Sequence, residues 1–161
     1  MNDIPERRRW FEEYCRRLDE DAVVKSSKGK RRYPCPCCGF PTLESRGQYD
    51  ICSLCGWEDD GQDDPHEREV WGGPNHKYSL AAARANFADH LTMYDRGQDT
   101  RAGGEDTPEI QEAKRRLMEA YEALRSSLEP EAAGPLWRLA RKAEDMLWKL
   151  ELKKLKDDGY L

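Results

Sequence analysis

The chain has 161 residues, of which 37% are hydrophobic and 37% are charged, and its formal net charge is −5. This composition predicts one compact domain, or a small domain with appended helices, whose thin core needs stabilisation by a metal ion or by packing between amphipathic helices. The sequence contains no stretch of the roughly 20 apolar residues that a membrane span requires, and no apolar signal-peptide region follows its charged opening, so we expect a cytoplasmic protein.

The charge is unevenly distributed along the sequence. Residues 1–34 carry 10 basic and 7 acidic groups, residues 35–106 carry 6 and 14, and residues 107–161 carry 11 of each. Binding to a nucleic-acid duplex needs a concentrated positive face, and the middle of the chain has the opposite sign.

The first predicted element is an amphipathic helix from Pro5 to about Asp21, within an N-terminal segment of residues 1–24. A proline is favourable in the first turn of a helix. Apolar residues recur every three or four positions on one face, which is the usual signature of docking on a core. That face consists of Trp10, Phe11, Tyr14, Cys15 and Leu18.

A linker of residues 25–32 follows, with five positive charges and no negative one. We expect this segment to be flexible. Together with the aromatic Tyr33 it is the feature that favours nucleic acid, so weak nucleic-acid contact through residues 25–32 is part of the alternative function considered below.

Two cysteine pairs follow the linker. Cys35 and Cys38 are separated by two residues, thirteen residues intervene, and Cys52 and Cys55 repeat the spacing. This arrangement is typical of a structural zinc site, in which a turn between two knuckles brings four thiolates around one ion. Such a site is closed and leaves no open position for metal-activated water. Disulfides, a redox dithiol and an iron–sulfur cluster are the alternatives.

Cys37 makes the first pair ambiguous, because it is also close enough to Cys35 to compete with Cys38. We prefer Cys38 as the ligand, since a glycine follows it as a glycine follows Cys55. Cys37 would then be a spare thiol at the tip of the knuckle, with a reactive or second-metal role as the alternative.

Between the cysteine pairs, residues 42–45 and 48–51 have the composition of two short strands around a turn at residues 46–47. The fold class expected from this pattern is α+β. It comprises a small zinc-ribbon β-hairpin module packed with amphipathic helices, and it includes an antiparallel helical hairpin at the C-terminal end.

An acidic loop lies beyond Trp57. We expect the carboxylates of this loop to be solvated, with partner recognition and a second metal site as alternatives, although their spacing is not that of a calcium loop. The loop contains Glu58, Asp59, Asp60, Asp63 and Asp64. The three histidines have no nearby cysteine or helical histidine partner, so we expect them to be surface or capping residues; they are His66, His76 and His90.

Three further helices are predicted. Ser79 is a suitable N-cap for a helix from Leu80 to about Arg96, which would complete a domain of residues 32–96. After a second linker, a helix starts at Thr107–Pro108 and extends to residue 128, and another spans residues 135–157. Rods of similar length joined by a short loop predict an antiparallel hairpin over residues 107–158.

The ordered motifs of the cysteine module resemble one known family. They are Tyr33-Pro34-Cys35-Pro36-Cys37-Cys38-Gly39-Phe40, Ile51-Cys52-Ser53-Leu54-Cys55-Gly56-Trp57-Glu58-Asp59-Asp60, Gly72-Gly73-Pro74-Asn75, and Ser79-Leu80 before Ala85-Asn86-Phe87. Over residues 32–90 the sequence is similar to the cysteine-rich CPCC domain family of mostly bacterial proteins. This resemblance implies a small zinc-ribbon-like domain.

These observations favour a non-enzymatic protein with a structural zinc ion in a four-cysteine site. We expect a protein-interaction adaptor or an immunity-like inhibitor whose partner is another protein, with a basic protein among the candidates, bound through the acidic loop with Trp57 and Trp71 or through the helical hairpin. A nucleic-acid-binding zinc-ribbon regulator is the alternative. An enzyme is disfavoured because the sequence lacks a nucleophile–base pair, a phosphate-binding glycine loop and an open metal site.

Overall fold

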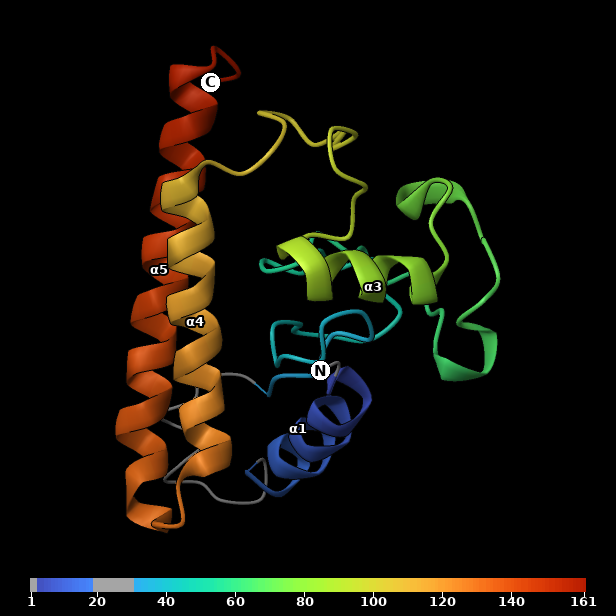
Figure 1. Ribbon diagram of the computed structural model, residues 1–161. Helices are drawn as coiled ribbons and strands as arrows, with labels where there is room; N and C mark the ends of the chain where they lie inside the picture. Colours follow the sequence, from blue (N-terminus) through green and yellow to red (C-terminus); the bar gives the residue numbers. More distant parts are fainter. Residues whose placement is uncertain (1–2, 19–30) are drawn as a thin grey trace. The chain divides into compact units, whose positions relative to one another are not determined.

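The computed structural model describes residues 3–18 and 31–161, and the chain folds into two compact units, residues 1–94 and residues 95–161. Figure 1 shows the helices of each unit. Within the described residues no helix is long and apolar enough to cross a membrane. The predicted basic linker lies mostly outside these residues; of its charged groups only Arg31 and Arg32 are described.

Helix α1 spans Ile4–Leu18 and begins the first unit. Its buried face is Ile4, Arg7, Phe11, Cys15 and Leu18. The helix confirms the predicted element, but the buried face is rotated from the predicted one. Trp10 and Tyr14 are only half-buried and stack on each other, with 4.5 Å between ring centroids, at the edge of that face. The predicted end at Asp21 lies outside the described residues.

The expected fold class, α+β with a β-hairpin, is wrong. The described residues form helices and two isolated bridges, Tyr33 with Leu43 and Ile51 with Glu58, and no sheet. The two predicted strands do not pair with each other. Each bridge instead joins the two segments that flank one cysteine pair.

The segment between the cysteine pairs is held by side-chain hydrogen bonds rather than by backbone hydrogen bonds between paired strands. The Asp50 carboxylate accepts hydrogen bonds from the backbone N–H groups of Glu44 and Ser45, at 3.2 and 3.0 Å. Tyr49 has a φ of +65°, in the left-handed region, which breaks the extended backbone that a strand requires. These local contacts use the donors on which the predicted hairpin depends.

Helix α3 spans Leu80–His90 and is capped as predicted, because Ser79 Oγ accepts a hydrogen bond from Ala82 N at 3.0 Å. It ends six residues before the expected Arg96. Leu91 takes a left-handed conformation with φ +64°, and the chain turns back so that Met93 N donates to Cys55 O at 2.8 Å. The end of the helix is therefore determined by a contact with the second cysteine pair.

The second unit contains the predicted helical hairpin. Helix α4 spans Pro108–Ser126, with Thr107 as its N-cap, and helix α5 spans Ala133–Asp157. The two helices pack antiparallel (Figure 1). The buried residues of α5 are Trp137, Ala140 and Leu147, which recur at the three- and seven-residue spacing of one helix face.

The segment before α4 is tied to the hairpin by ion pairs instead of being a plain linker. Lys114 on α4 is fully buried and pairs with Asp106 at 2.5 Å. Arg101 pairs with the same carboxylate at 3.0 Å and with Asp99 at 2.5 Å. A buried lysine on an apolar helix face is stable only with such a partner.

Candidate metal centre

The first cysteine pair forms a tight knuckle. Cys35 N donates to Phe40 O at 2.9 Å, and Gly39 N donates to Cys35 O at 2.8 Å. Gly39 has a φ of +81°, and a Cβ at this position would lie 3.0 Å from the carbonyl oxygen of Ile4 on α1. Glycine is therefore required both by the backbone conformation and by the close approach of α1.

The second pair repeats this geometry. Cys52 N donates to Trp57 O at 2.9 Å, and Gly56 N donates to Cys52 O at 3.0 Å, with Gly56 at φ +84°. The two knuckles share the pattern of a cysteine pair, a glycine in the left-handed region and a buried aromatic residue. The sequence signal of a glycine after each pair thus has a conformational cause.

The knuckles bring four sulfur atoms together. The Sγ atoms of Cys35, Cys38, Cys52 and Cys55 all lie within 4.8 Å of one another, and all four residues are buried. Sγ of Cys35 lies 3.6 Å from that of Cys55, and Sγ of Cys38 lies 3.6 Å from that of Cys52. A tetrahedral zinc site with Zn–S bonds of about 2.3 Å has edges of about 3.8 Å. The donor set and its dimensions therefore fit one tetrahedral divalent ion.

Backbone and side-chain donors surround these sulfurs. Cys37 N lies 3.4 Å from Cys35 Sγ, Trp57 N lies 3.4 Å from Cys55 Sγ, and Thr42 Oγ1 donates to Cys52 Sγ at 3.0 Å. Such donors stabilise thiolates and orient them toward a metal ion.

The electrostatics of the four thiols differ. Burial raises the pKa of Cys35, Cys38 and Cys55 well above the ordinary value. Burial acts in the same direction on Cys52, but hydrogen bonds from the other three thiols and from Thr42 outweigh it and lower the pKa of Cys52. Without a cation, three of the four buried thiols are therefore unfavourable to ionise, and a divalent ion supplies the missing positive charge.

Arg7 of α1 covers one side of the first knuckle. Its guanidinium donates to the Cys38 carbonyl oxygen from Nε at 3.1 Å and from Nη2 at 2.6 Å, and it lies 4.0 Å from the centroid of the Phe40 ring. It also pairs with Asp3 at 2.7 Å. Only 6% of Arg7 is exposed, so this cation belongs to the core of the module.

Arg84 of α3 binds the same knuckle from another element. Its Nε donates to Pro36 O at 2.9 Å, and its remaining nitrogens pair with Asp64 at 2.6 Å and Glu67 at 2.8 Å. Arg84 is also 6% exposed. Four thiolates around a divalent ion carry a formal charge of −2, and two buried guanidinium groups bind backbone carbonyl oxygens of the first knuckle.

The acidic loop is largely neutralised within the molecule, contrary to the expectation of solvated carboxylates. Asp59 is fully buried and accepts from Arg46 Nε at 3.0 Å. Asp63 bridges Arg8 and Arg46; its distance to Arg46 Nη2 is 3.0 Å. Burial acts to raise the pKa of Asp63, but the hydrogen bonds from Arg8, from the backbone of Asp64 and from Arg46 dominate and hold it well below the ordinary value.

Residues 66–71 form a loop that follows the ion-paired residues Asp59 and Asp63 in the sequence. Gln62, which is fully buried, donates from Nε2 to the carbonyl oxygens of His66 at 2.8 Å and Glu69 at 2.6 Å. The loop presents Val70 and Trp71, which are 57% and 46% exposed. Trp57, the other tryptophan expected to bind a partner, is fully buried beside the cysteines and is not accessible.

The remaining candidate residues lie outside the cluster. Cys37 is fully buried but is not one of the four clustered thiols, and Cys15 is buried on α1. His66 pairs with Glu69 at 2.6 Å, and His90 lies 2.6 Å from Tyr94 O at the end of α3. The expectation of surface or capping histidines is confirmed for His66 and His76, which are exposed, whereas the His90 side chain is 9% exposed and binds a carbonyl beyond the end of α3.

Sequence reasoning missed the residues that hold the knuckles from outside. They are Arg7, Arg46, Asn75, Arg84 and Met93. For Arg7 and Arg84 a signal is present, because each stands on the apolar stripe of its helix, between buried hydrophobic residues. For Asn75 the signal is the Gly72-Gly73-Pro74-Asn75 motif. Its side chain donates to Glu58 O at 2.7 Å and accepts from Glu58 N at 3.0 Å, in place of a strand.

Comparison with known proteins gives one result. A family model described as "Cysteine-rich CPCC" matches residues 33–107, which include all four clustered cysteines and α3. No curated protein and no solved structure matches the chain.

Proposed function

Because residues 33–107 of this chain form a cysteine-rich CPCC domain, we propose that its four clustered cysteines hold one zinc ion as a scaffold and that the protein acts without catalysis. In this proposal it is a protein-binding adaptor or inhibitor. The observation that carries the proposal is the complete burial of a closed set of four sulfur ligands. Zinc with four protein ligands has no open position for substrate or water.

The binding surface in this proposal is the loop of residues 66–71. Val70 and Trp71 are exposed, and large aromatic residues are the commonest anchors at protein interfaces. The loop is linked to the zinc site through Arg84, which binds Pro36 O of the first knuckle and the carboxylate of Glu67. Zinc binding would thereby hold the loop in one conformation and reduce the entropy lost on binding.

The acidic residues of the loop contribute less to partner binding than their number in the sequence implies. Asp59, Asp63 and Asp64 are paired with arginines of the same unit. The partner is therefore recognised through an apolar pocket that accepts the Trp71 indole, and opposite charge is a secondary feature.

Elemental analysis of the purified protein tests the metal. One zinc ion per chain is expected, and its removal by a chelator should reduce the near-ultraviolet circular dichroism, to which the buried Trp57 contributes. Iron at the same stoichiometry, or a chain that stays folded without metal, would contradict the assignment.

A pull-down from native lysate tests the binding role. The chain should recover a stoichiometric protein, and the variant Val70→Ser/Trp71→Ser should lose it while keeping its zinc. Ile51→Ser is the matched control, because Ile51 is an exposed apolar residue of the same unit. Recovery of nucleic acid without a stoichiometric protein would favour the alternative, a nucleic-acid-binding regulator.

A further inference from the structure

Helix α5 carries two apolar stripes, and only one of them packs on α4. The packed stripe contains Trp137, Ala140 and Leu147, which are buried. The Trp137 ring meets Tyr121 of α4 edge to face, with 6.2 Å between centroids.

The second stripe is offset by one residue. It consists of Leu136, Leu139, Ala143, Met146 and Leu150, with alternating spacings of three and four residues. This is the a/d spacing of a helix that packs against another helix over several turns. Leu139 and Met146 are nonetheless 56% and 57% exposed.

Three residues of the second stripe, Ala143, Met146 and Leu150, line a groove along the hairpin, and Leu136 and Leu139 continue the stripe beyond it. The groove has a volume of about 950 Å³ and an apolar floor that includes Ala113 of α4 with Ala143, Met146 and Leu150 of α5. Charged residues form its two edges. On the α4 edge lie Glu109, Glu112 and Arg116, and on the α5 edge lie Lys142, Asp145 and Lys149.

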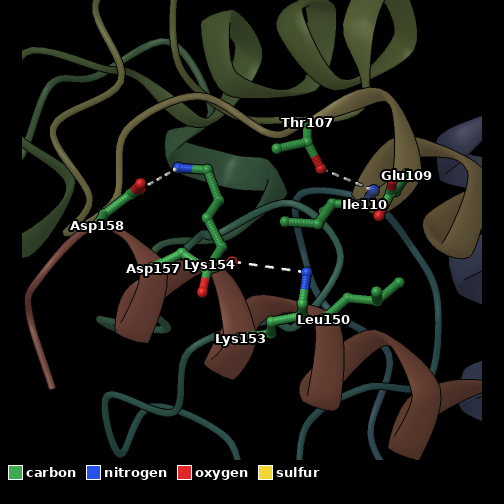
Figure 2. Close-up of a pocket in the computed structure, with 8 residues that line it drawn as sticks. All are labelled: Thr107, Glu109, Ile110, Leu150, Lys153, Lys154, Asp157 and Asp158. Atoms are coloured by element: carbon green, nitrogen blue, oxygen red, sulfur yellow. Dashed lines mark hydrogen bonds and ion pairs between the residues drawn. The ribbon is translucent and has the colours of Figure 1, made fainter.

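A smaller hollow of about 170 Å³ at the open end of the hairpin is different in character (Figure 2). Both of its lysines are already paired, Lys153 with Asp157 at 3.5 Å and Lys154 with Asp158 at 3.2 Å. The Thr107 hydroxyl accepts from Ile110 N at 3.2 Å. This hollow therefore offers no spare charge for an anion, in contrast to the apolar groove.

We propose that the groove is the contact between two copies of this chain, which together form an antiparallel four-helix bundle. The groove is complementary to itself. Because α4 and α5 are antiparallel, Glu109 lies at the level of Leu150, and both line the groove. A two-fold axis parallel to the helices places α4 of one copy over α5 of the second copy.

In this arrangement Glu109 of each copy lies opposite Lys149 of the other, so one pair of opposite charges forms twice. Arg116 and Asp145 give both edges mixed charge, and Glu112 is already paired with Arg116 of its own helix at 3.5 Å. The exposed apolar stripes, which interdigitate as in other helical bundles, therefore supply most of the contact. A helix hairpin buries only one face by itself, and a second hairpin covers the other face of α5 with helices of matching length. This inference concerns the second unit and does not depend on zinc binding or on the loop of residues 66–71.

Native mass spectrometry and analytical ultracentrifugation of the zinc-loaded full chain test the proposal. The expected mass is twice 18.7 kDa. The variant Leu139→Glu/Met146→Glu should run at the mass of one chain with unchanged helical circular dichroism. Leu128→Glu is the control, because Leu128 is 93% exposed in the loop between the helices and outside the groove, and it should remain dimeric.

Charge exchange provides a test that does not rely on core substitutions. Glu109→Lys and Lys149→Glu should each dimerise about tenfold more weakly or worse, because like charges then face each other. An equimolar mixture of the two should form a heterodimer with the affinity restored.

A chain that is monomeric over the whole concentration range overturns the proposal, whether or not another protein is bound to it. A dimer that survives both the Leu139→Glu/Met146→Glu change and the charge reversals overturns it as well, because its interface then lies elsewhere.

Discussion

Arg7 of α1 donates two hydrogen bonds to the carbonyl oxygen of Cys38, from Nε at 3.1 Å and from Nη2 at 2.6 Å. The two residues are 31 positions apart in the sequence. The contact joins the first helix to a cysteine knuckle and places a buried positive charge on the backbone of one of the four clustered cysteines. It makes α1 part of the cysteine module.

Replacement of Arg7 by methionine tests this connection. Arg7→Met leaves a buried carbonyl oxygen without its donor, so we expect the free energy of unfolding to fall by about 2 kcal/mol. Urea unfolding of the zinc-loaded protein measures the change. Arg16→Met is the control on the same helix, because the Arg16 side chain is 52% exposed, and it should change stability by less than about 0.5 kcal/mol. Equal effects of the two variants would refute the role of Arg7.

The four clustered cysteines should differ from Cys37 in their effect on metal content. Cys52→Ser should lose the metal, and with it on the order of 10 kcal/mol of binding free energy, which matches the whole stability of a typical domain. Cys37→Ser should keep one ion per chain. Elemental analysis measures the metal content of the two variants, and near-ultraviolet circular dichroism reports whether their buried aromatic residues stay ordered. If Cys37→Ser lost the metal as Cys52→Ser does, Cys37 would be a ligand.

Gly39 should tolerate a side chain less well than Gly61 does. Gly39→Ala forces a Cβ into the left-handed region and to within 3.0 Å of Ile4 O, so strain of about 1–2 kcal/mol and a clash of about 1–3 kcal/mol are both expected. Gly61→Ala is the comparison, because Gly61 has a φ of +92° and no atom within 4 Å of the added Cβ. Thermal unfolding should show a larger loss for Gly39→Ala. A smaller loss would mean that α1 moves away without cost.

Asp63 should make the first unit sensitive to acid. Its pKa is lower in the folded protein than in the unfolded chain, because Arg8 and Arg46 bind the carboxylate. Its contribution to stability is therefore complete above the unfolded value of about 3.9 and is lost as the pH falls toward the folded value. Asp63→Asn should be less stable than the wild type at neutral pH, and the difference should shrink below about pH 4. A difference that does not change with pH would contradict this account.

Lys114 should show the cost of an unpaired buried charge. Lys114→Met leaves Asp106 with less compensation, and removal of one partner of a buried pair typically costs about 3–5 kcal/mol. The double variant Lys114→Met/Asp106→Asn should recover much of this loss, since neither charge remains. Denaturant titration of all three proteins gives the comparison. A double variant that is as unstable as Lys114→Met would mean that packing, and not charge, dominates at this position.

Sequence reasoning predicted the helices well because each has a local signal. Ser79 and Thr107 cap α3 and α4 as expected, and the apolar repeats of residues 108–157 predict the hairpin. Helix faces were predicted less well. On α5 two apolar stripes are offset by one residue, and periodicity alone does not distinguish the packed stripe from the exposed one.

The prediction of a β-hairpin was wrong for a physical reason. Residues 42–51 have strand-like composition, but strand pairing requires that their backbone donors be available. Asp50 takes the donors of Glu44 and Ser45, and Arg46 and Gly47 bind Asp59. Side chains that compete for backbone groups are not visible in a hydrophobic pattern.

The sequence by itself determines which four cysteines cluster, since two equal spacings, each followed by a glycine, describe two knuckles that fit one tetrahedral ion. The tertiary structure alone decides what surrounds them. Arg7 and Arg84 reach the knuckle carbonyls from residues 31 and 48 positions away, and Met93 ends α3 by binding Cys55 O. These contacts depend on how separate elements pack, whereas the knuckles depend on backbone conformation over six residues, and only the latter is encoded in local spacing.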